Sequence, residues 1–239
     1  WIRLVNAFLL KVLLSMSNKE PDADLNIRGL FSKIFTEEPL MRDIKDNGQV
    51  VYLDQEKNRY PDFNSSSLGS GMYVDSTFIK RLQDHKDPRL FLFCTQTKEA
   101  KEAGKAINDF SAYEGGDPAA PYATVNEKAT KGKVSKVLER YYQDPINEPS
   151  ILLGYAEQEL ILAEASVRQW ISSDANKHYT NSVKASFKFY ESYVKSLAGY
   201  VDDKAAELYL SNPENELSNK RAKDEKIKSI VLQKYFQSY

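Results

Sequence analysis

Apolar residues recur at helical spacing at both ends of the sequence, while residues 47–149 between them are crowded with turn-forming residues. Residues 1–46 and 150–239 therefore predict helices that bury one face. The middle segment contains Asn47-Gly48, Gly115-Gly116 and several prolines, which interrupt regular structure. Long irregular segments of compact domains are usually functional. We therefore expect a mainly α fold in which helix pairs pack against a long, loop-rich region that carries the function.

The spacing places the individual helices. The first covers residues 1–16. A second starts near Asp22 or Asp24 and is expected to turn Leu30, Phe31, Ile34 and Phe35 inward. In the middle, Asp75 is expected to cap a short helix. The residues of the first helix that fall at the spacing of an amphipathic helix, and so form its apolar face, are Trp1, Leu4, Val5, Phe8, Leu9, Val12, Leu13 and Met16.

The C-terminal helical region resembles one tetratricopeptide-type unit. Ser150 is expected to cap a helix that runs to Trp170 with Leu152 on its inner side. A second long helix continues to Leu197, and the two form an αα-hairpin. A shorter helix after Asp202 and a last helix after Pro213 complete the region.

Composition excludes several classes of protein. The 239 residues include 33 Lys and Arg against 34 Asp and Glu, so no strong net charge favours nucleic acid. One cysteine excludes an internal disulfide framework, and with two histidines we expect no metal site. No apolar run approaches the roughly 18 residues that span a bilayer.

Both ends of the sequence look like cuts through helices, because the helical pattern is already present at Trp1 and still continues at Tyr239. We therefore expect residues 1–239 to be one domain truncated at both ends. Such cuts would leave apolar stripes in water. We expect Phe8, Leu9 and Val12 on one side, and Val231 and Tyr235 on the other, to be exposed.

No catalytic motif or phosphate-binding loop occurs, so we expect neither enzymatic activity nor a cofactor. Cys94 lies in an apolar stretch and is expected to be a buried, inert thiol. Glu157 and Glu164 share a helix face, where hydrogen bonds to neighbouring elements are the favoured interpretation. The alternative is a glycan hydrolase with paired carboxylates roughly 5 to 9.5 Å apart.

The middle segment is rich in aromatic residues that lie among Asn, Asp, Gly and Ser. A tyrosine on a polar loop offers a flat apolar face and a hydroxyl, which suits stacking on sugar rings or on peptide side chains. Each of these residues could equally anchor the loop onto the helices. The candidate ligand contacts are Tyr60, Phe63, Tyr73, Tyr113 and Tyr122.

Several segments, in order along the chain, resemble the SusD/RagB-like outer-membrane nutrient-binding lipoproteins. One difference is Gln169, where that family usually has glycine before a tryptophan. The matching segments are Trp1 to Asn6, Asp87-Pro88-Arg89-Leu90, Tyr113 to Gly116, Tyr155-Ala156-Glu157, Leu162 to Ala165, Arg168-Gln169-Trp170, Tyr179 with Val183 to Phe187, and Lys226 to Ile230 with Gln233-Lys234-Tyr235.

The resemblance implies a protein on the outer surface of Bacteroidetes-type bacteria. It implies a lipid anchor outside this chain, and tetratricopeptide-like helix pairs that support an irregular ligand-facing region. The implied partner is a TonB-dependent, SusC-like transporter, to which oligosaccharides, or peptides in some members, are delivered. A different class stays open: a tetratricopeptide-type adaptor that binds proteins through a concave helix face and binds no small ligand.

Overall fold

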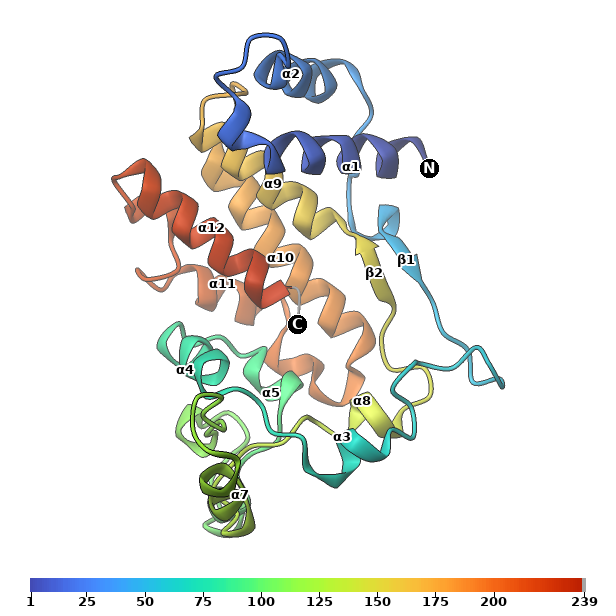
Figure 1. Ribbon diagram of the computed structural model, residues 1–239, viewed down its shortest axis with the longest axis vertical. Helices are drawn as coiled ribbons and strands as arrows, with labels where there is room; N and C mark the ends of the chain where they lie inside the picture. Colours follow the sequence, from blue (N-terminus) through green and yellow to red (C-terminus); the bar gives the residue numbers. More distant parts are fainter. Residues whose placement is uncertain (238–239) are drawn as a thin grey trace. The chain divides into compact units, whose positions relative to one another are not determined.

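The computed structural model describes residues 1–237, and for residues 70 and 71 the backbone alone. Tyr239, where the helical pattern of the sequence ends, lies outside this range. The fold is mainly α, as predicted (Figure 1). Its helices are α1 (Ile2–Ser15), α2 (Ile27–Glu37), α3 (Ser66–Gly71), α4 (Ser76–Asp84), α5 (Leu90–Phe93), α6 (Lys98–Glu102), α7 (Tyr122–Thr130), α8 (Arg140–Gln143), α9 (Tyr155–Val167), α10 (Ala175–Tyr193), α11 (Asp203–Leu210) and α12 (Lys223–Gln237).

Contacts divide the chain into two compact units. The first contains Trp1–Val50, Ser150–Phe189 and the chain from Leu210 on. The second contains Val51–Pro149 and Tyr190–Tyr209. The predicted single, truncated domain stays a prediction. No helix in the described residues is long and apolar enough to cross a membrane.

The core of the first unit lies between α1, α2 and α9. Leu10 and Leu14 of α1 pack with Phe31 of α2 and Ile161 of α9 in one cluster. The ring of Phe31 meets that of Trp170 edge-on, with 5.5 Å between the centroids. The predicted apolar face of α1 is partly correct, because Leu4, Leu13 and Met16 pack against the core. The fully buried residues of the helix are instead Asn6, Ala7, Leu10 and Leu14. The exposure expected for Phe8, Leu9 and Val12 is confirmed.

α2 differs from the prediction at its start and on its inner face. It begins at Ile27, after Asn26 in the left-handed region with φ 42°. Phe31 is buried and Ile34 and Phe35 pack against the same core cluster, as predicted, whereas Leu30 is 45% exposed. Ile27, which was not predicted, is buried as well. The earlier Asp22 and Asp24 lie in turns, where the Asp22 carboxylate accepts the amide of Asp24.

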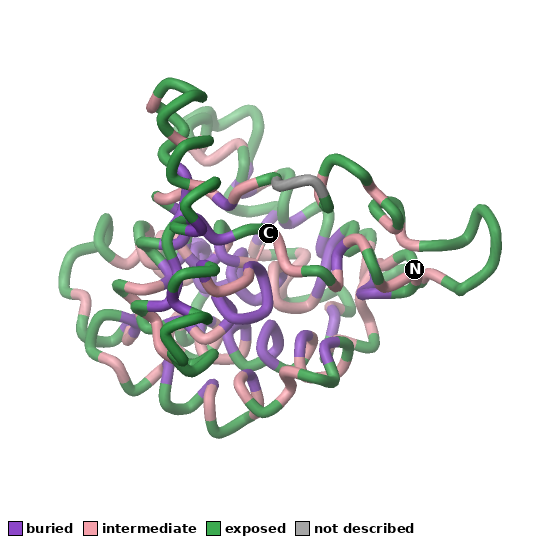
Figure 2. The backbone as a smooth tube through the Cα atoms, turned by 90° about the horizontal axis from the view of Figure 1, so that it is seen from below, coloured by how far each residue is buried: buried purple, intermediate pink, exposed green. Residues whose placement is uncertain are grey.

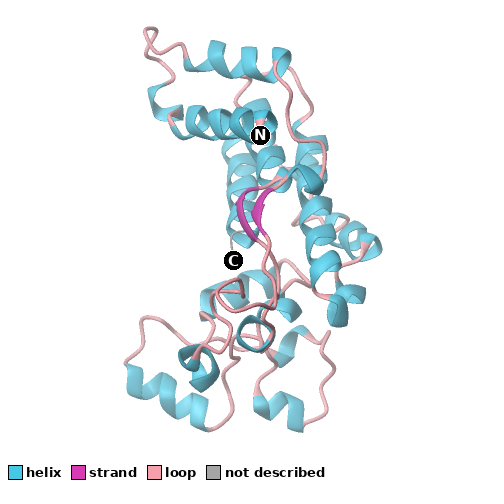
Figure 3. Ribbon diagram, turned by 90° about the vertical axis from the view of Figure 1, so that its right-hand side faces the viewer, coloured by secondary structure: helices cyan, strands magenta, loops and turns pink. Residues whose placement is uncertain are grey.

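Residues 150–153 form a strand, not the first turn of a helix. β2 (Ser150–Leu153) pairs antiparallel with β1 (Gly48–Val50), and these are the two strands among the described residues (Figure 3). The register of the two strands shifts by one residue between Gly48 and Gln49. Leu152 therefore has no partner residue in β1, and its side chain is 69% exposed. The predicted cap at Ser150 is therefore wrong. Instead, the side chain of Asn47 accepts the amide of Tyr155 at 2.8 Å, at the first turn of α9.

The αα-hairpin is confirmed by α9 and α10. Every residue of α9 from Gln158 to Ala165 is buried, because neighbouring helices cover more than one side of it. α12 packs along α9, and Lys234 reaches Glu164 at 2.8 Å. Figure 2 shows buried and exposed positions alternating along the helical backbones.

The second unit contains the irregular segment, which the structure resolves into short helices joined by turns. α4 confirms the predicted cap, since the Asp75 carboxylate accepts the amides of Thr77 and Phe78. Phe78, Ile79 and Leu82 form its buried face. Cys94 is 1% exposed, and burial raises the pKa of its thiol. The prediction of a buried thiol is confirmed.

Candidate functional site

Three partly accessible aromatic residues of the second unit, Tyr52, Tyr60 and Phe63, lie within residues 52–63, which we call the aromatic loop. The rings of Tyr52 and Tyr60 meet edge-on with centroids 5.4 Å apart and an interplanar angle of 85°. Phe63 carries the guanidinium of Arg59 over its ring, 5.2 Å from the centroid. Tyr52, Tyr60 and Phe63 are each half-buried, so one part of each ring packs and the rest meets solvent.

Hydrogen bonds fix the shape of this loop. The amide of Leu53 donates to the carbonyl of Asn58 at 2.8 Å, and Lys57 takes a positive φ of 70° to close the turn. The ion pair of Arg59 with Asp54, at 2.7 Å, spans the same turn. At its far end the amide of Tyr60 donates to the carbonyl of Pro145 at 2.7 Å. The loop is thus attached to the segment that follows α8.

A buried polar cluster lies beside Tyr60. Arg140 donates to the side chains of Asn147 and Glu148, each at 2.7 Å, and to the carbonyl of Leu92 at 2.9 Å. Burial raises the pKa of Glu148, and the attraction of Arg140 opposes that shift. Burial also raises the pKa of Tyr60, and the carboxylate of Glu148 adds to it. Tyr60 therefore keeps its proton at neutral pH and offers a hydroxyl at the edge of its ring.

Tyr73 and Tyr122 belong to a second group, around Gly116. A side chain at Gly116 would place its Cβ 3.0 Å from Val125 of α7 and 3.5 Å from the Cβ of Tyr73. This close approach brings α7 against the segment of Tyr73, which pairs with Lys136 in an isolated bridge. Tyr122, at the start of α7, is 78% exposed. Tyr73 is half-buried.

Tyr113 is a core residue of the second unit. It is 4% exposed, and its hydroxyl donates to the carbonyl of Ile107 at 2.8 Å. Its ring lies against that of Phe91, with centroids 5.6 Å apart, and burial raises the pKa of the hydroxyl. As a ligand contact, Tyr113 stays a prediction that this packing does not favour.

The structure thus places Tyr60 and Phe63 in one loop, and Tyr73 and Tyr122 on two other segments that both approach Gly116. Sequence reasoning missed Arg59 and Arg140, and it did not select Tyr52 as a candidate. Tyr52 carries the same signal as Tyr60, an aromatic residue among polar ones. Arg59 precedes Phe63 by four positions, but that spacing indicates contact only within a helix, and this segment is a loop.

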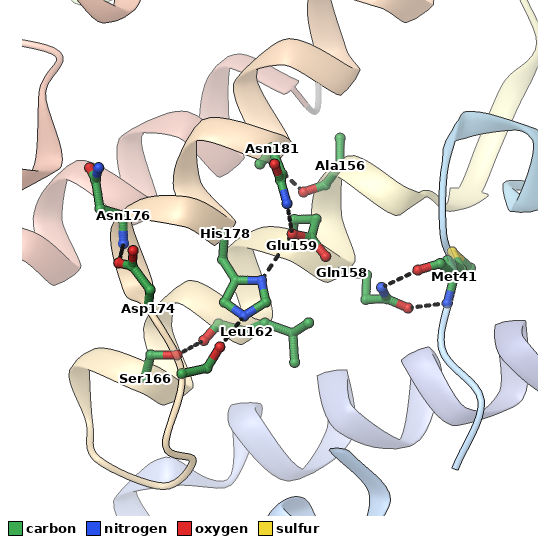
Figure 4. A network of polar contacts seen from close by, with 12 residues as sticks. Met41, Ala156, Gln158, Glu159, Leu162, Ser166, Asp174, Asn176, His178 and Asn181 are labelled. Carbon is green, nitrogen blue, oxygen red and sulfur yellow. Dashed lines mark hydrogen bonds and ion pairs between the residues drawn. The ribbon is translucent and has the colours of Figure 1, made fainter. Parts of the chain in front are cut away.

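A serine, a histidine and a glutamate of the first unit line up at hydrogen-bonding distances. His178 lies 2.9 Å from Glu159 through Nδ1 and 2.8 Å from the hydroxyl of Ser173 through Nε2. This order matches a catalytic triad. The same atoms join the two helices of the hairpin, since Asn181 of α10 also donates to Glu159 of α9 at 3.0 Å (Figure 4). We interpret the three residues as a link within the hairpin.

The other carboxylates of α9 form ion pairs with neighbouring helices. Glu157 pairs with Lys11 of α1 at 2.7 Å. Glu164 pairs with Arg168 and with Lys234 of α12, both at 2.8 Å. These contacts confirm the structural interpretation of Glu157 and Glu164.

The first unit also has a cavity of about 800 Å³, lined by residues 1–4, Pro39 and residues 45–49. Arg3 approaches Asp46 across it at 3.7 Å. The backbone amide of Arg42 lowers the pKa of Asp46, and Arg3 adds to the shift. None of the aromatic candidates lines this cavity.

A family model and the solved structures that match this chain point to the same protein family. A SusD-like family model, described as "Starch-binding associating with outer membrane", matches residues 1–239. No curated protein sequence matches the chain significantly.

Solved structures agree with the family model. A Bacteroides vulgatus protein described as a "putative outer membrane protein, probably involved in nutrient binding" is 52% identical with a TM-score of 0.96, and the match covers 99% of this chain and 52% of that one. A SusD homologue of Bacteroides fragilis is 46% identical with a TM-score of 0.92, and the match covers 98% of this chain and 51% of that one. A chitin-binding SusD homologue of Flavobacterium johnsoniae shares the fold at 15% identity and a TM-score of 0.66, with 100% of this chain and 48% of that one covered. The chain therefore spans about half the length of the solved relatives that it matches.

Proposed function

This chain belongs to the SusD-like family, and we propose that it is part of a cell-surface protein that binds a nutrient ligand, an oligosaccharide, and delivers it to a TonB-dependent, SusC-like transporter in the outer membrane. In this proposal the parent protein is a lipoprotein, held at the membrane by an anchor outside this chain. It binds its ligand without chemical change and needs no cofactor.

The observation that carries this proposal is the aromatic loop. Tyr52, Tyr60 and Phe63 present partly exposed rings, and the polar groups of Arg59 and Asp54 lie beside them. Sugar rings have apolar C–H faces and a rim of hydroxyls, so they bind best where flat rings adjoin hydrogen-bonding groups. We assign the stacking contacts to Tyr60 and Phe63, with Tyr52 as a third ring.

We include Tyr73 and Tyr122 in the proposed binding surface. Tyr122 is the most exposed of the candidates, and Tyr73 lies in the segment against which α7 packs. We propose that these two residues form an additional contact. Tyr113 supports the unit from within.

An adaptor that binds proteins through the hairpin is less consistent with the structure. Such an adaptor needs an accessible helix face. α9 is buried at eight consecutive positions, Gln158 to Ala165, so it has little surface to offer. A peptide ligand remains the second candidate within the family, because side chains of peptides stack on the same rings.

Calorimetric titration of the protein distinguishes these ligands. The panel contains a starch-derived hexasaccharide, a chitin-derived hexasaccharide and a mixture of short peptides. The two sugars are chosen because the description of the family model names starch binding and that of one solved relative names chitin binding. Saturable binding of a hexasaccharide supports the proposal. Binding of peptides alone would change the ligand class, and absence of binding to every probe would contradict the assignment of the site to this chain.

A further inference from the structure

The side-chain amide of Asn147 is a buried hydrogen-bond donor without an acceptor. Asn147 is 7% exposed. Among the residues that the structure describes, none accepts a hydrogen bond from its Nδ2 atom. A buried polar group that lacks a hydrogen-bond partner destabilises the folded protein, and most buried amides therefore have one. We expect the missing acceptor of Asn147 to come from outside the chain.

Arg140 fixes the orientation of this amide. The guanidinium of Arg140 donates to Oδ1 of Asn147 at 2.7 Å. The opposite orientation would turn the amino group of Asn147 toward the guanidinium, and both of these groups can only donate. Arg140 is itself held by Glu148 at 2.7 Å and by the carbonyl of Leu92 at 2.9 Å. Nδ2 of Asn147 therefore faces away from the guanidinium.

Asn147 follows the segment to which the aromatic loop is attached. The amide of Tyr60 donates to the carbonyl of Pro145 at 2.7 Å, and the amide of Asn64 donates to the carbonyl of Tyr142 at 2.8 Å. Burial raises the pKa of Tyr60, and the side chain of Asn147 opposes that shift, although no hydrogen bond of normal geometry joins the two groups. The donor without an acceptor thus lies beside the hydroxyl of a candidate stacking ring.

The chain turns inward at Asn147. Ile146, the residue before it, is 49% exposed, whereas Glu148, the residue after it, is 8% exposed. Asn147 itself has a φ of 30°. Residues other than glycine rarely adopt a positive φ, and such strained conformations are common where a protein binds a ligand. The turn keeps the amide at the border between the buried polar cluster and the surface.

We propose that Nδ2 of Asn147 donates a hydrogen bond to an oxygen of the sugar that stacks on Tyr60, and that this bond makes Asn147 a specificity-determining residue. The inference rests on the proposed function. Stacking is tolerant, because sugar rings share an apolar face. A buried donor is selective, since a ligand without an acceptor at that place leaves the donor unpaired. The ligand class is therefore a sugar that directs a hydroxyl or acetamido oxygen to the edge of the Tyr60 ring.

Two substitutions remove the donor in different ways. Asn147→Asp replaces Nδ2 by an oxygen and keeps the acceptor for Arg140. Asn147→Gly removes the whole amide, and glycine adopts a positive φ without steric cost. Each variant should weaken calorimetric binding of the hexasaccharide that the wild-type protein binds about tenfold, as loss of one hydrogen bond predicts. The control is Asn26→Asp, which makes the same change at an exposed residue with a φ of 42° and should keep the wild-type Kd.

Nuclear magnetic resonance of the isotope-labelled protein tests the contact itself. The side-chain amide signal that is missing from Asn147→Gly belongs to Asn147, and it should shift on titration with the hexasaccharide with the calorimetric Kd. Circular dichroism checks that the variants are folded. If the wild-type protein binds the sugar but this signal stays in place, or if both folded variants keep the wild-type Kd, the inference is overturned and the proposed function stands. A wild-type protein that binds neither hexasaccharide would overturn both.

Discussion

Arg89 and Asp87 form an ion pair that is closed to solvent on both sides, since neither side chain has measurable exposure. Nε of Arg89 donates to the carboxylate at 3.0 Å, and the amide of Arg89 donates to the same carboxylate at 3.0 Å. The guanidinium also lies 5.7 Å from the ring centroid of Tyr209. Burial lowers the pKa of Arg89, but the attraction of Asp87 outweighs it. The Asp-Pro-Arg-Leu motif thus forms a buried ion pair within the second unit.

Removing one partner leaves a buried charge without compensation. We expect Arg89→Met to lower the free energy of unfolding by about 3–5 kcal/mol. Urea unfolding followed by circular dichroism measures it. The double variant Asp87→Asn/Arg89→Met should lose less than the sum of the two single variants. Additive losses would show that the two groups do not act as a pair.

Gly115 allows two backbone segments to touch. A Cβ at this position would lie 2.4 Å from the backbone of Ser76, whose amide donates to the carbonyl of Gly116 at 2.9 Å. We expect Gly115→Ala to destabilise the protein by roughly 1–3 kcal/mol, because the backbone has to shift. Gly199→Ala is the control, since nothing lies within 4 Å of its Cβ position. Equal melting temperatures of the two variants would refute the close approach.

Gln169 ends α9 in a conformation that glycine prefers. Its φ is 62°, and the amide of Trp170 donates to the carbonyl of Ala165 at 2.9 Å, which is the Schellman pattern. We expect Gln169→Gly to raise the free energy of unfolding by roughly 0.5–1 kcal/mol, because glycine adopts a positive φ without steric cost. Gln169→Ala keeps the Cβ and should bring no gain. If Gln169→Gly destabilises the protein, the side chain has a role that the exposed position does not suggest.

Glu164 makes the stability of the first unit sensitive to acid. Burial raises the pKa of Glu164, but Lys234 and Arg168 outweigh it and bring it below the ordinary value of 4.5. The folded state therefore binds fewer protons than the unfolded state, so the stabilisation is present above pH 4.5 and is lost as pH falls through the folded pKa.

Urea unfolding at about pH 6 and about pH 3 measures this dependence. Glu164→Gln should lose less stability over the interval than the wild-type protein does. Glu157→Gln serves as the control, because its ion pair with Lys11 is more exposed and therefore screened. An identical loss in the wild-type protein and in Glu164→Gln would contradict the proposed role of Glu164.

Local signals in the sequence predicted the parts of the fold that depend on local interactions. The cap at Asp75 acts on residues two and three positions away, so its helix follows from sequence. The strand at Ser150–Leu153 depends on pairing with Gly48–Val50, about one hundred positions earlier, and no local pattern contains that partner. The prediction of the buried face of α1 was partly incorrect for another reason. This helix has apolar residues on two opposite sides, so the periodicity alone does not show which side is buried.

The candidate site shows the same division. Residue type and polar surroundings predicted that Tyr60 and Phe63 lie on a loop with partly accessible rings, and the structure agrees. The same criteria also selected Tyr113, because sequence does not reveal that its hydroxyl is bonded to Ile107 inside the core. Arg59 is recognised as part of the candidate site only in the structure, where its guanidinium lies over the ring of Phe63.

If the aromatic loop binds the ligand, as we propose, the affinity of the Tyr60→Ala variant for that ligand should fall. The measurement is the calorimetric Kd for the hexasaccharide that the wild-type protein binds. Leu208→Ala is the control, because Leu208 is a 74% exposed leucine outside the aromatic loop. Loss of one stacked ring should weaken binding about tenfold, which corresponds to ~1.4 kcal/mol, while Leu208→Ala keeps the wild-type Kd. A Tyr60→Ala variant that folds and binds the sugar as tightly as the wild-type protein would show that the aromatic loop is not the binding site.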